Sequence, residues 1–575
     1  MSTGSTKSRG RNSSSSRTRS GGEEVRRGMV AASATSAAAA SEASGPEMEP
    51  RTWQLASLLV LIVATLVRLY ALELNPLHHD EGVNSFFLIN LINTGNYSYD
   101  PQNYHGPTLY YFALPLMKLC GRLGFGLSTF ALRLVPVLFG VATVWLILCL
   151  RRRLGAVGAL AGAALVALSP GAVYMSRYFI HESLFVFFTL GVVVASLRYY
   201  DSANPVYLML ASVSAALLFA TKETAMISAG VILIAFGMAA FYGRFDNTAP
   251  AAKARGRARG ARNKRQARNL WRDEGSETTG ERFGGAAGIA VWSLSAAALF
   301  IFVYVLFYTS FFTHAQGVSD SLKTFEVWAR TGRKDHVHEW YTYLSWLWQE
   351  EPPLLALGLV GALAALGQPR NRFAVFAALW AFGIIAAYSL IPYKTPWLAL
   401  NFIVPLAISS GYGLDLLYRR AAADAGRSVL VLALAIVALV ISGYRMSQLN
   451  FRHYDDDRYV YPYAHTVRGI FPLLDQINRF AAQTGQGTET RISITSADYW
   501  PLPWYLRDYK HIGYYAGRVA VSNEALVIGS DMQEPELESL LGDRYRRLGS
   551  FALRPSVTLI LYARRDLLRN PEPAP

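Results

Sequence analysis

Charged residues and cysteines are scarce in this sequence of 575 residues. Asp, Glu, Lys and Arg make up 17% of it and apolar residues 52%, whereas a soluble globular protein carries about 25% charge. The two cysteines, Cys120 and Cys149, both lie in apolar stretches. They exclude a disulfide-stapled scaffold and a cysteine-based metal site. The shortage of charge indicates that much of the chain meets a medium other than water.

Large apolar side chains are almost absent from residues 1–50, which are rich in Ser, Gly, Ala and Arg. Such a segment cannot bury a core, so we expect a disordered tail. It contains no apolar stretch typical of a signal peptide. Met29 and Met48 are alternatives to Met1 as the start of the protein.

Apolar runs of about 20 residues, enough to cross ~30 Å of hydrocarbon, recur after the tail. They predict an α-helical integral membrane protein with about eleven transmembrane helices. The expected spans are 53–72, 130–150, 154–173, 182–199, 205–221, 224–242, 286–309, 353–367, 372–390, 396–418 and 428–446. The segment 107–120 is short for a span, and we expect it to lie in the interface.

The net charge of +15 is concentrated in the tail and in loops between apolar segments. Lys and Arg accumulate in cytoplasmic loops, so this pattern predicts a cytoplasmic N-terminus in a multi-pass protein of the cell (plasma) membrane. The basic loops are 151–155, 243–284, 367–372 and 418–427. We interpret 243–284 as a cytoplasmic anchor on anionic lipid. Because no aromatic residues are interleaved with its charges, we expect no nucleic-acid partner.

The last part of the chain, 447–575, changes in character. Alternating or apolar runs at 491–497, 525–530 and 556–563 predict strands, and 534–545 predicts an amphipathic helix. We therefore expect three parts: a disordered cytoplasmic tail (1–50), a transmembrane domain (51–446) and a small external α/β domain (447–575).

Polar residues gather on the predicted external side. Asp80 and Glu81 directly follow the first span, where they form either a solvated interfacial pair or a general base for a hydroxyl. His181 and Glu182 enter an apolar span after Arg177. They could form an ion pair with Arg177, face a phosphate or bind a metal: imidazole suits Zn²⁺, and carboxylate suits Mg²⁺ or Mn²⁺.

Two lysines on this side suit an anionic lipid headgroup. Lys222 is followed by Glu223, with which it could instead form a salt bridge, and Lys394 lies between two prolines. His105 precedes the short helix at 107–120, where it either caps the helix or binds a ligand. Further polar and aromatic candidates are Asp335, His336, His338, Glu339 and the aromatic run 498–505, which either binds carbohydrate or packs on the membrane domain.

Several motifs resemble one known group of enzymes. HHDEGVNSFF, HGPTLYYF, ALRLVPVLFG, SRYFIHESL and LLFATKETA are similar to motifs of the lipid-phosphate-dependent membrane glycosyltransferases of the GT-C fold. These include protein O-mannosyltransferases and the aminoarabinose transferase of lipid A, and the resemblance covers roughly residues 53–420. With IPYKTPWLALNF and DYWPLPWYLRD added, the chain resembles the flippase-activity-associated proteins over residues 53–565.

This resemblance implies an inverting transfer of a sugar from a polyprenyl-phosphate donor to a protein or glycolipid acceptor at the external face. By motif position, Asp80 would be the catalytic base and Glu81 its support. His105, Arg177, Lys222 and Lys394 would bind the substrate. His181 and Glu182 would be the ligands of a divalent metal (Mg, Mn or Zn), although Glu182 stands where the family more often has aspartate. The alternative is a flippase, or a flippase accessory, that holds lipid-linked sugars without catalysis.

Overall fold

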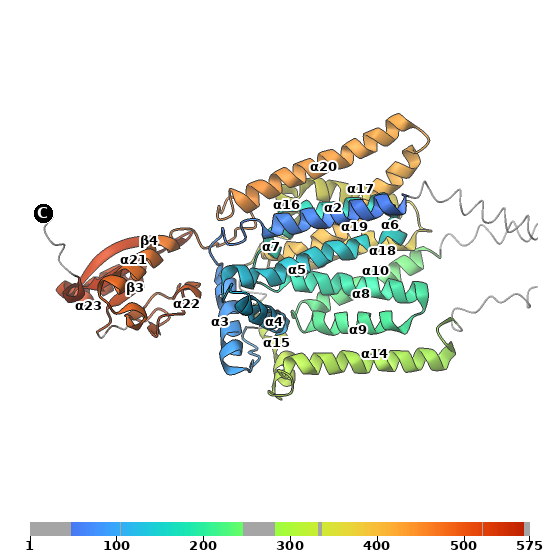
Figure 1. Ribbon diagram of the computed structural model, residues 1–575. Helices are drawn as coiled ribbons and strands as arrows, with labels where there is room; N and C mark the ends of the chain where they lie inside the picture. Colours follow the sequence, from blue (N-terminus) through green and yellow to red (C-terminus); the bar gives the residue numbers. More distant parts are fainter. Residues whose placement is uncertain are drawn as a thin grey trace, which may run out of the picture.

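The computed structural model describes residues 48–103, 105–244, 282–331, 336–519, 521 and 523–568. Nearly all of the predicted disordered tail (1–50) and of the basic loop 243–284 lies outside these residues. The described chain forms a bundle of long helices, with a small sheet beyond one end of the bundle (Figure 1).

The long helices lie side by side along one direction, as spans of a membrane protein do (Figure 1). Eight helices of the described residues are long and apolar enough to cross a membrane. They are α2 (Pro50–Leu69), α5 (Thr129–Leu148), α8 (Glu182–Ser202), α10 (Ala225–Tyr242), α14 (Gly285–Tyr308), α18 (Arg372–Leu390), α19 (Leu400–Ala421, extended by the 3₁₀ turn Pro396–Ala399) and α20 (Ala425–Phe451).

Three further segments complete the predicted set of apolar helices. Helices α6 (Arg151–Leu168) and α7 (Pro170–Ser176) form one pair bent by 60°. Helices α9 (Pro205–Phe219) and α17 (Pro352–Leu366) are apolar but have 15 residues each. All eleven expected spans therefore coincide with a helix or a bent pair. The number that cross the membrane stays a prediction.

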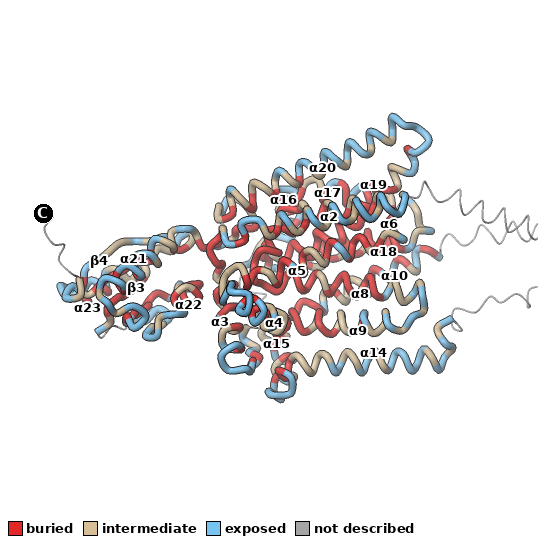
Figure 2. The backbone as a smooth tube through the Cα atoms, viewed as in Figure 1, coloured by how far each residue is buried: buried red, intermediate tan, exposed pale blue. Residues whose placement is uncertain are grey.

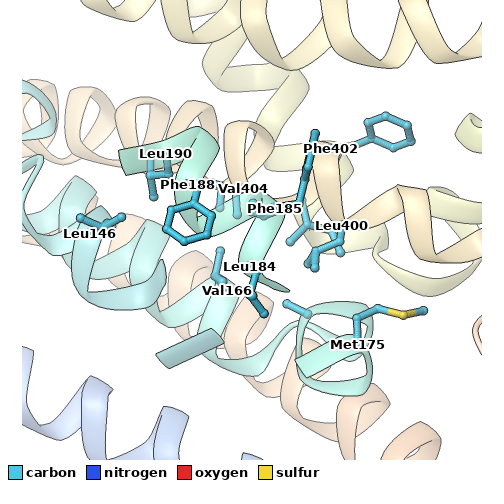
Figure 3. Close-up of a cluster of buried hydrophobic side chains, with 14 of the residues drawn as sticks. Leu146, Val166, Met175, Leu184, Phe185, Phe188, Leu190, Leu400, Phe402 and Val404 are labelled. Carbon is cyan, nitrogen blue, oxygen red and sulfur yellow. The ribbon is translucent and has the colours of Figure 1, made fainter. Parts of the chain in front are cut away.

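The inner helices of the bundle are more buried than the outer ones (Figure 2). In α19, 94% of the most apolar stretch is buried, against 6% in α14, whose apolar side chains face outward as expected beside lipid. Figure 3 shows part of the core, with Phe185 and Phe188 of α8 near Val404 and Phe402 of α19.

Small residues bring two core helices close together. A Cβ added at Gly411 of α19 would lie 2.2 Å from the Gly158 carbonyl oxygen of α6, and one at Gly162 would lie 2.8 Å from the Ala407 carbonyl oxygen. Transmembrane helices pack through small residues because lipid supplies no hydrophobic drive between them. This contact holds the centre of the bundle.

Shorter helices lie at the end of the bundle nearest the sheet (Figure 1). They are α3 (His79–Thr94), α4 (Thr108–Arg122), α15 (Gly317–Thr331) and α16 (Thr342–Glu350). Helix α4 coincides with the predicted short helix 107–120. At the opposite end, the Arg151 guanidinium donates to the Met48 carbonyl oxygen over 3.1 Å, so the beginning of α2 lies beside the arginines at 151–153.

The C-terminal part of the chain contains a five-stranded sheet of order β2-β1-β3-β5-β4. The strands are β1 (Arg491–Ile494), β2 (His511–Tyr514), β3 (Leu526–Ser530), β4 (Tyr545–Arg554) and β5 (Val557–Arg564). Strands β2, β1 and β3 are parallel, whereas β5 is antiparallel to both β3 and β4. Helices α21 (Ile470–Gln483), α22 (Leu502–Tyr505) and α23 (Glu534–Leu541) accompany the sheet. The predicted strands correspond to β1, β3 and β5, and the predicted helix to α23.

Candidate active site

A cavity of about 290 Å³ lies at the end of the bundle nearest the sheet. It is enclosed by the beginning of α3, the segment before α4, the turns α7–α8 and α9–α10, and the segment after α18. Five predicted site residues line it: Asp80, His105, His181, Glu182 and Lys222. These residues are separated by up to 142 positions in the sequence, and the fold brings them to one place.

Asp80 carries the most accessible carboxylate of this group, with 42% of its side chain exposed. It lies in the first turn of α3, where the positive end of the helix dipole favours a negative charge. His78 Nδ1 lies 3.8 Å from the Asp80 carboxylate and accepts a hydrogen bond from the Asp80 backbone N–H. Asp80 is therefore positioned to accept a proton from a molecule in the cavity.

Glu81, the predicted support of Asp80, points away from the cavity and is fully buried. Its two carboxylate oxygens accept hydrogen bonds from Arg133 of α5 at 2.8 and 2.7 Å. They also accept from the backbone N–H groups of Phe179 and His78, each over 2.9 Å. Glu81 thus fixes the beginning of α3, and with it the backbone that carries Asp80.

A buried ion pair and a histidine–carboxylate contact form another wall of the cavity. The Lys222 ammonium lies 2.6 Å from the Glu182 carboxylate, and His105 Nδ1 lies 3.2 Å from the Glu223 carboxylate. Lys222, between α9 and α10, thus pairs with Glu182 at the beginning of the neighbouring α8, in place of the salt bridge with Glu223 considered above. Burial lowers the pKa of Lys222, but Glu182 and Glu223 outweigh that effect and raise it, so Lys222 is a fixed cation.

His181 is buried beside these pairs. Its Nε2 donates to the Gly106 carbonyl oxygen over 3.0 Å, which leaves the buried Nδ1 as an acceptor without a hydrogen-bond partner among the described residues. Burial is the main cause of a His181 pKa well below its ordinary value, and the nearby His105 and Lys222 lower it further. The imidazole at this wall is therefore neutral.

The residues that line this cavity are not arranged as the ligands of a metal site. No group of three or more His, Cys, Asp or Glu side chains in the described part of the chain is arranged to hold a metal ion. Of the two predicted ligands, Glu182 is bound to Lys222, and His181 has one free ring nitrogen. We therefore derive no chemical step from a metal.

Two predicted substrate-binding residues lie outside the cavity lining. Arg177 donates to backbone carbonyl oxygens at the end of α2, including those of Arg68 and Ala71, and so caps that helix. The Lys394 ammonium donates to the carbonyl oxygens of Ile391 at 2.7 Å and His338 at 3.2 Å. Both side chains thus contact backbone carbonyl groups, and their binding of substrate stays a prediction.

Several residues at the site carry roles that sequence reasoning missed. Arg133 lies within the motif ALRLVPVLFG, where a lone arginine in an apolar span was a signal for a buried partner. Glu223 was considered only as a partner of Lys222. His79 and His336 line the cavity as well, whereas Asp335 lies outside the described residues.

The fold and parts of the sequence are similar to known proteins. Residues 104–246 match the family model of dolichyl-phosphate-mannose-protein mannosyltransferase. Among solved structures, ArnT from Cupriavidus metallidurans bound to undecaprenyl phosphate is 15% identical, with a TM-score of 0.56 over 90% of this chain and 99% of that one. The Archaeoglobus fulgidus oligosaccharyltransferase in complex with Zn and sulfate is 15% identical, with a TM-score of 0.48 over 88% and 75%. No match was found among curated proteins.

The predicted fold is therefore confirmed: this is a multi-pass membrane protein with the GT-C fold of lipid-phosphate-dependent glycosyltransferases. The closer resemblance to flippase-activity-associated proteins stays a prediction.

Proposed function

We propose that this protein is a membrane glycosyltransferase that moves a sugar from a polyprenyl-phosphate donor to an acceptor hydroxyl. One observation carries the proposal: the same cavity holds the accessible carboxylate of Asp80 and the buried cation of Lys222. A base for the acceptor and a positive charge for the departing phosphate are the two groups that this reaction needs.

The reaction is a single displacement at the anomeric carbon. Asp80 takes the proton of the acceptor hydroxyl, and the hydroxyl oxygen forms a bond to the anomeric carbon. The bond from that carbon to the phosphate oxygen breaks, and its electrons leave with the lipid phosphate. A lipid phosphate is a weak base, so no general acid is needed. Because the attack and the departure lie on opposite faces, the anomeric configuration inverts.

The proposal also assigns an orientation. Four arginines, Arg152, Arg153, Arg370 and Arg372, line one hollow at the end of the bundle away from the sheet. Following the positive-inside rule, we assign that end to the cytoplasm. The cavity and the C-terminal sheet then face the outside of the plasma membrane, and the acceptor is a protein or a glycolipid reached from there.

The test uses purified protein in detergent. Without a bilayer, the donor cannot be moved from one leaflet to the other, so only its chemical conversion is measured. It is supplied with radiolabelled polyprenyl-phosphate hexose and with peptide and glycolipid acceptors. We expect the label to leave the lipid and polyprenyl phosphate to accumulate. A protein that binds the donor but leaves it intact would overturn the transferase proposal in favour of a lipid-carrier role without catalysis.

Lys222 supplies the test of phosphate binding. Replacing it with Met removes the cation and leaves Glu182 buried without its partner, so we expect weaker inhibition by added polyprenyl phosphate and a lower kcat. Lys222→Arg keeps the charge and should retain part of both. Lys323→Met, at an exposed lysine of α15, is the control. Unchanged inhibition in Lys222→Met would contradict the assignment.

Metal removal is expected to leave transfer intact. The carboxylates of Glu182 and Glu223 are engaged by Lys222 and His105, so the cation in the cavity is an ammonium of the protein itself. The measurement compares turnover before and after dialysis against EDTA. Loss of turnover that is restored by Mn²⁺, Mg²⁺ or Zn²⁺ would show that a metal is required, and His181 would then be examined first.

A further inference from the structure

The C-terminal sheet region contacts the helix that carries Asp80. Tyr505 accepts a hydrogen bond from the Leu77 backbone N–H over 2.8 Å. A Cβ added at Gly82 of α3 would lie 2.7 Å from the Pro501 side chain, so the two segments are in close contact. The Trp500 ring lies 6.2 Å from the His79 ring, centroid to centroid. The aromatic run 498–505 therefore packs on the membrane domain, one of the two alternatives considered from the sequence.

One polar contact reaches the residue next to Asp80. Arg554, the last residue of β4, has a side chain that is 11% exposed. One of its guanidinium nitrogens lies 3.2 Å from His79 Nδ1, and another forms an ion pair with Asp498. A guanidinium only donates hydrogen bonds. His79 Nδ1 must therefore be the acceptor, and the ring is neutral, with its proton on Nε2.

The surroundings of His79 keep it in that state. Burial is the main cause of a lowered His79 pKa; His78 and Arg554 lower it further, whereas Asp80 and Asp498 raise it. His79 also lines the cavity, as does His336. If His79 were protonated, its Nδ1 would also carry a proton. Both groups would then be donors, and the hydrogen bond between His79 and Arg554 would be lost.

Two arginines thus hold the beginning of α3 from opposite sides. Arg133 of the bundle binds Glu81 on the buried side, and Arg554 of the sheet region binds His79 on the outer side. Asp80 lies between the two held residues. Its backbone can shift only if one of these contacts gives way.

We propose that Arg554 is a positioning residue, through which the docked C-terminal sheet fixes the placement of Asp80 in the active cavity. The inference rests on the proposed transferase function. In this arrangement, the C-terminal sheet region is a part of the active site, rather than a separate module for binding the acceptor.

The experiment compares Arg554→Gln with Arg507→Gln. Arg507 also joins the sheet region to the bundle, by donating to the Leu127 carbonyl oxygen over 2.9 Å, but it touches neither His79 nor Asp80. We expect Arg554→Gln to lower kcat about ten- to a hundredfold, because small misplacements of a reacting group cost this much. The KM for the donor should change little. Arg554→Lys should rescue part of kcat, since one ammonium can serve His79 or Asp498 but not both.

Hydrogen–deuterium exchange supplies a readout that does not depend on activity. The backbone N–H groups of His78, Asp80 and Gly82 are hydrogen-bonded within the first turn of α3. Their exchange should accelerate in Arg554→Gln and not in Arg507→Gln. Equal effects of the two variants on kcat and on exchange would overturn the inference, leaving a general docking contact. A wild-type protein that transfers no sugar, with faster exchange confined to Arg554→Gln, would instead contradict the transferase function and retain the positioning role.

Discussion

Asparagine in place of Asp80 is expected to lower the rate of sugar transfer by about 10²–10⁴-fold, the usual contribution of a general base. Asn has the shape of Asp but cannot accept the proton of the acceptor hydroxyl. Asp80 is 42% exposed and has no buried ion pair, so its loss should leave the folded protein and its binding of polyprenyl phosphate close to wild type.

The control for this variant is Asp320→Asn, which removes a carboxylate of α15 outside the cavity lining. Turnover is measured under saturating donor, and the quantity of folded protein by size-exclusion chromatography. A wild-type rate in Asp80→Asn would remove Asp80 from the chemistry. A loss of folded protein equal to the loss of rate would make Asp80 a structural residue.

Breaking the Glu81–Arg133 pair is expected to have the largest effect on folding. Glu81→Gln leaves the guanidinium of Arg133 charged and buried without a counter-charge, and such a loss costs about 3–5 kcal/mol. Arg133 also donates to the carbonyl oxygens of Leu72, Asn75 and Pro76, so the whole connection between α2 and α3 depends on its position. We expect a much lower unfolding temperature and little folded protein.

The matched control is the same substitution at an exposed pair. Glu489 binds Lys510 on the sheet region with both side chains more than half exposed, so Glu489→Gln should hardly change the unfolding temperature. The double variant Glu81→Gln with Arg133→Met removes both charges and should recover part of the lost stability. An unfolding temperature of Glu81→Gln equal to that of Glu489→Gln would show that the buried pair does not hold α3.

The sequence predicts the helical frame well because membrane spans are long and their apolar signal is strong. It also predicts the cavity group of Asp80, His105, His181, Glu182 and Lys222, since each interrupts or follows an apolar run. The sequence does not predict which of these side chains pair with one another. Glu182 and Lys222 are 40 residues apart in the sequence, and which lysine meets which carboxylate depends on how α8, α9 and α10 pack.

Contacts that form only in the folded chain are those that sequence reasoning does not predict. Arg177 and Lys394 have the positive charge of phosphate ligands, but each side chain donates hydrogen bonds to backbone carbonyl oxygens at the end of a helix. Strand β2 (His511–Tyr514) was missed because four residues with a central glycine carry little strand pattern. Helix α3 is not predicted from the sequence, because it lies outside the long apolar runs.

The central claim is a single displacement with Asp80 as the one base, and the anomeric configuration of the product tests it most directly. The measurement is the NMR coupling of the anomeric proton in the product, compared with that of the donor. The two other carboxylates that line the cavity, Glu182 and Glu223, are held by Lys222 and His105, so the account predicts inversion. Retention would require a carboxylate nucleophile and a covalent glycosyl intermediate, and it would contradict the account.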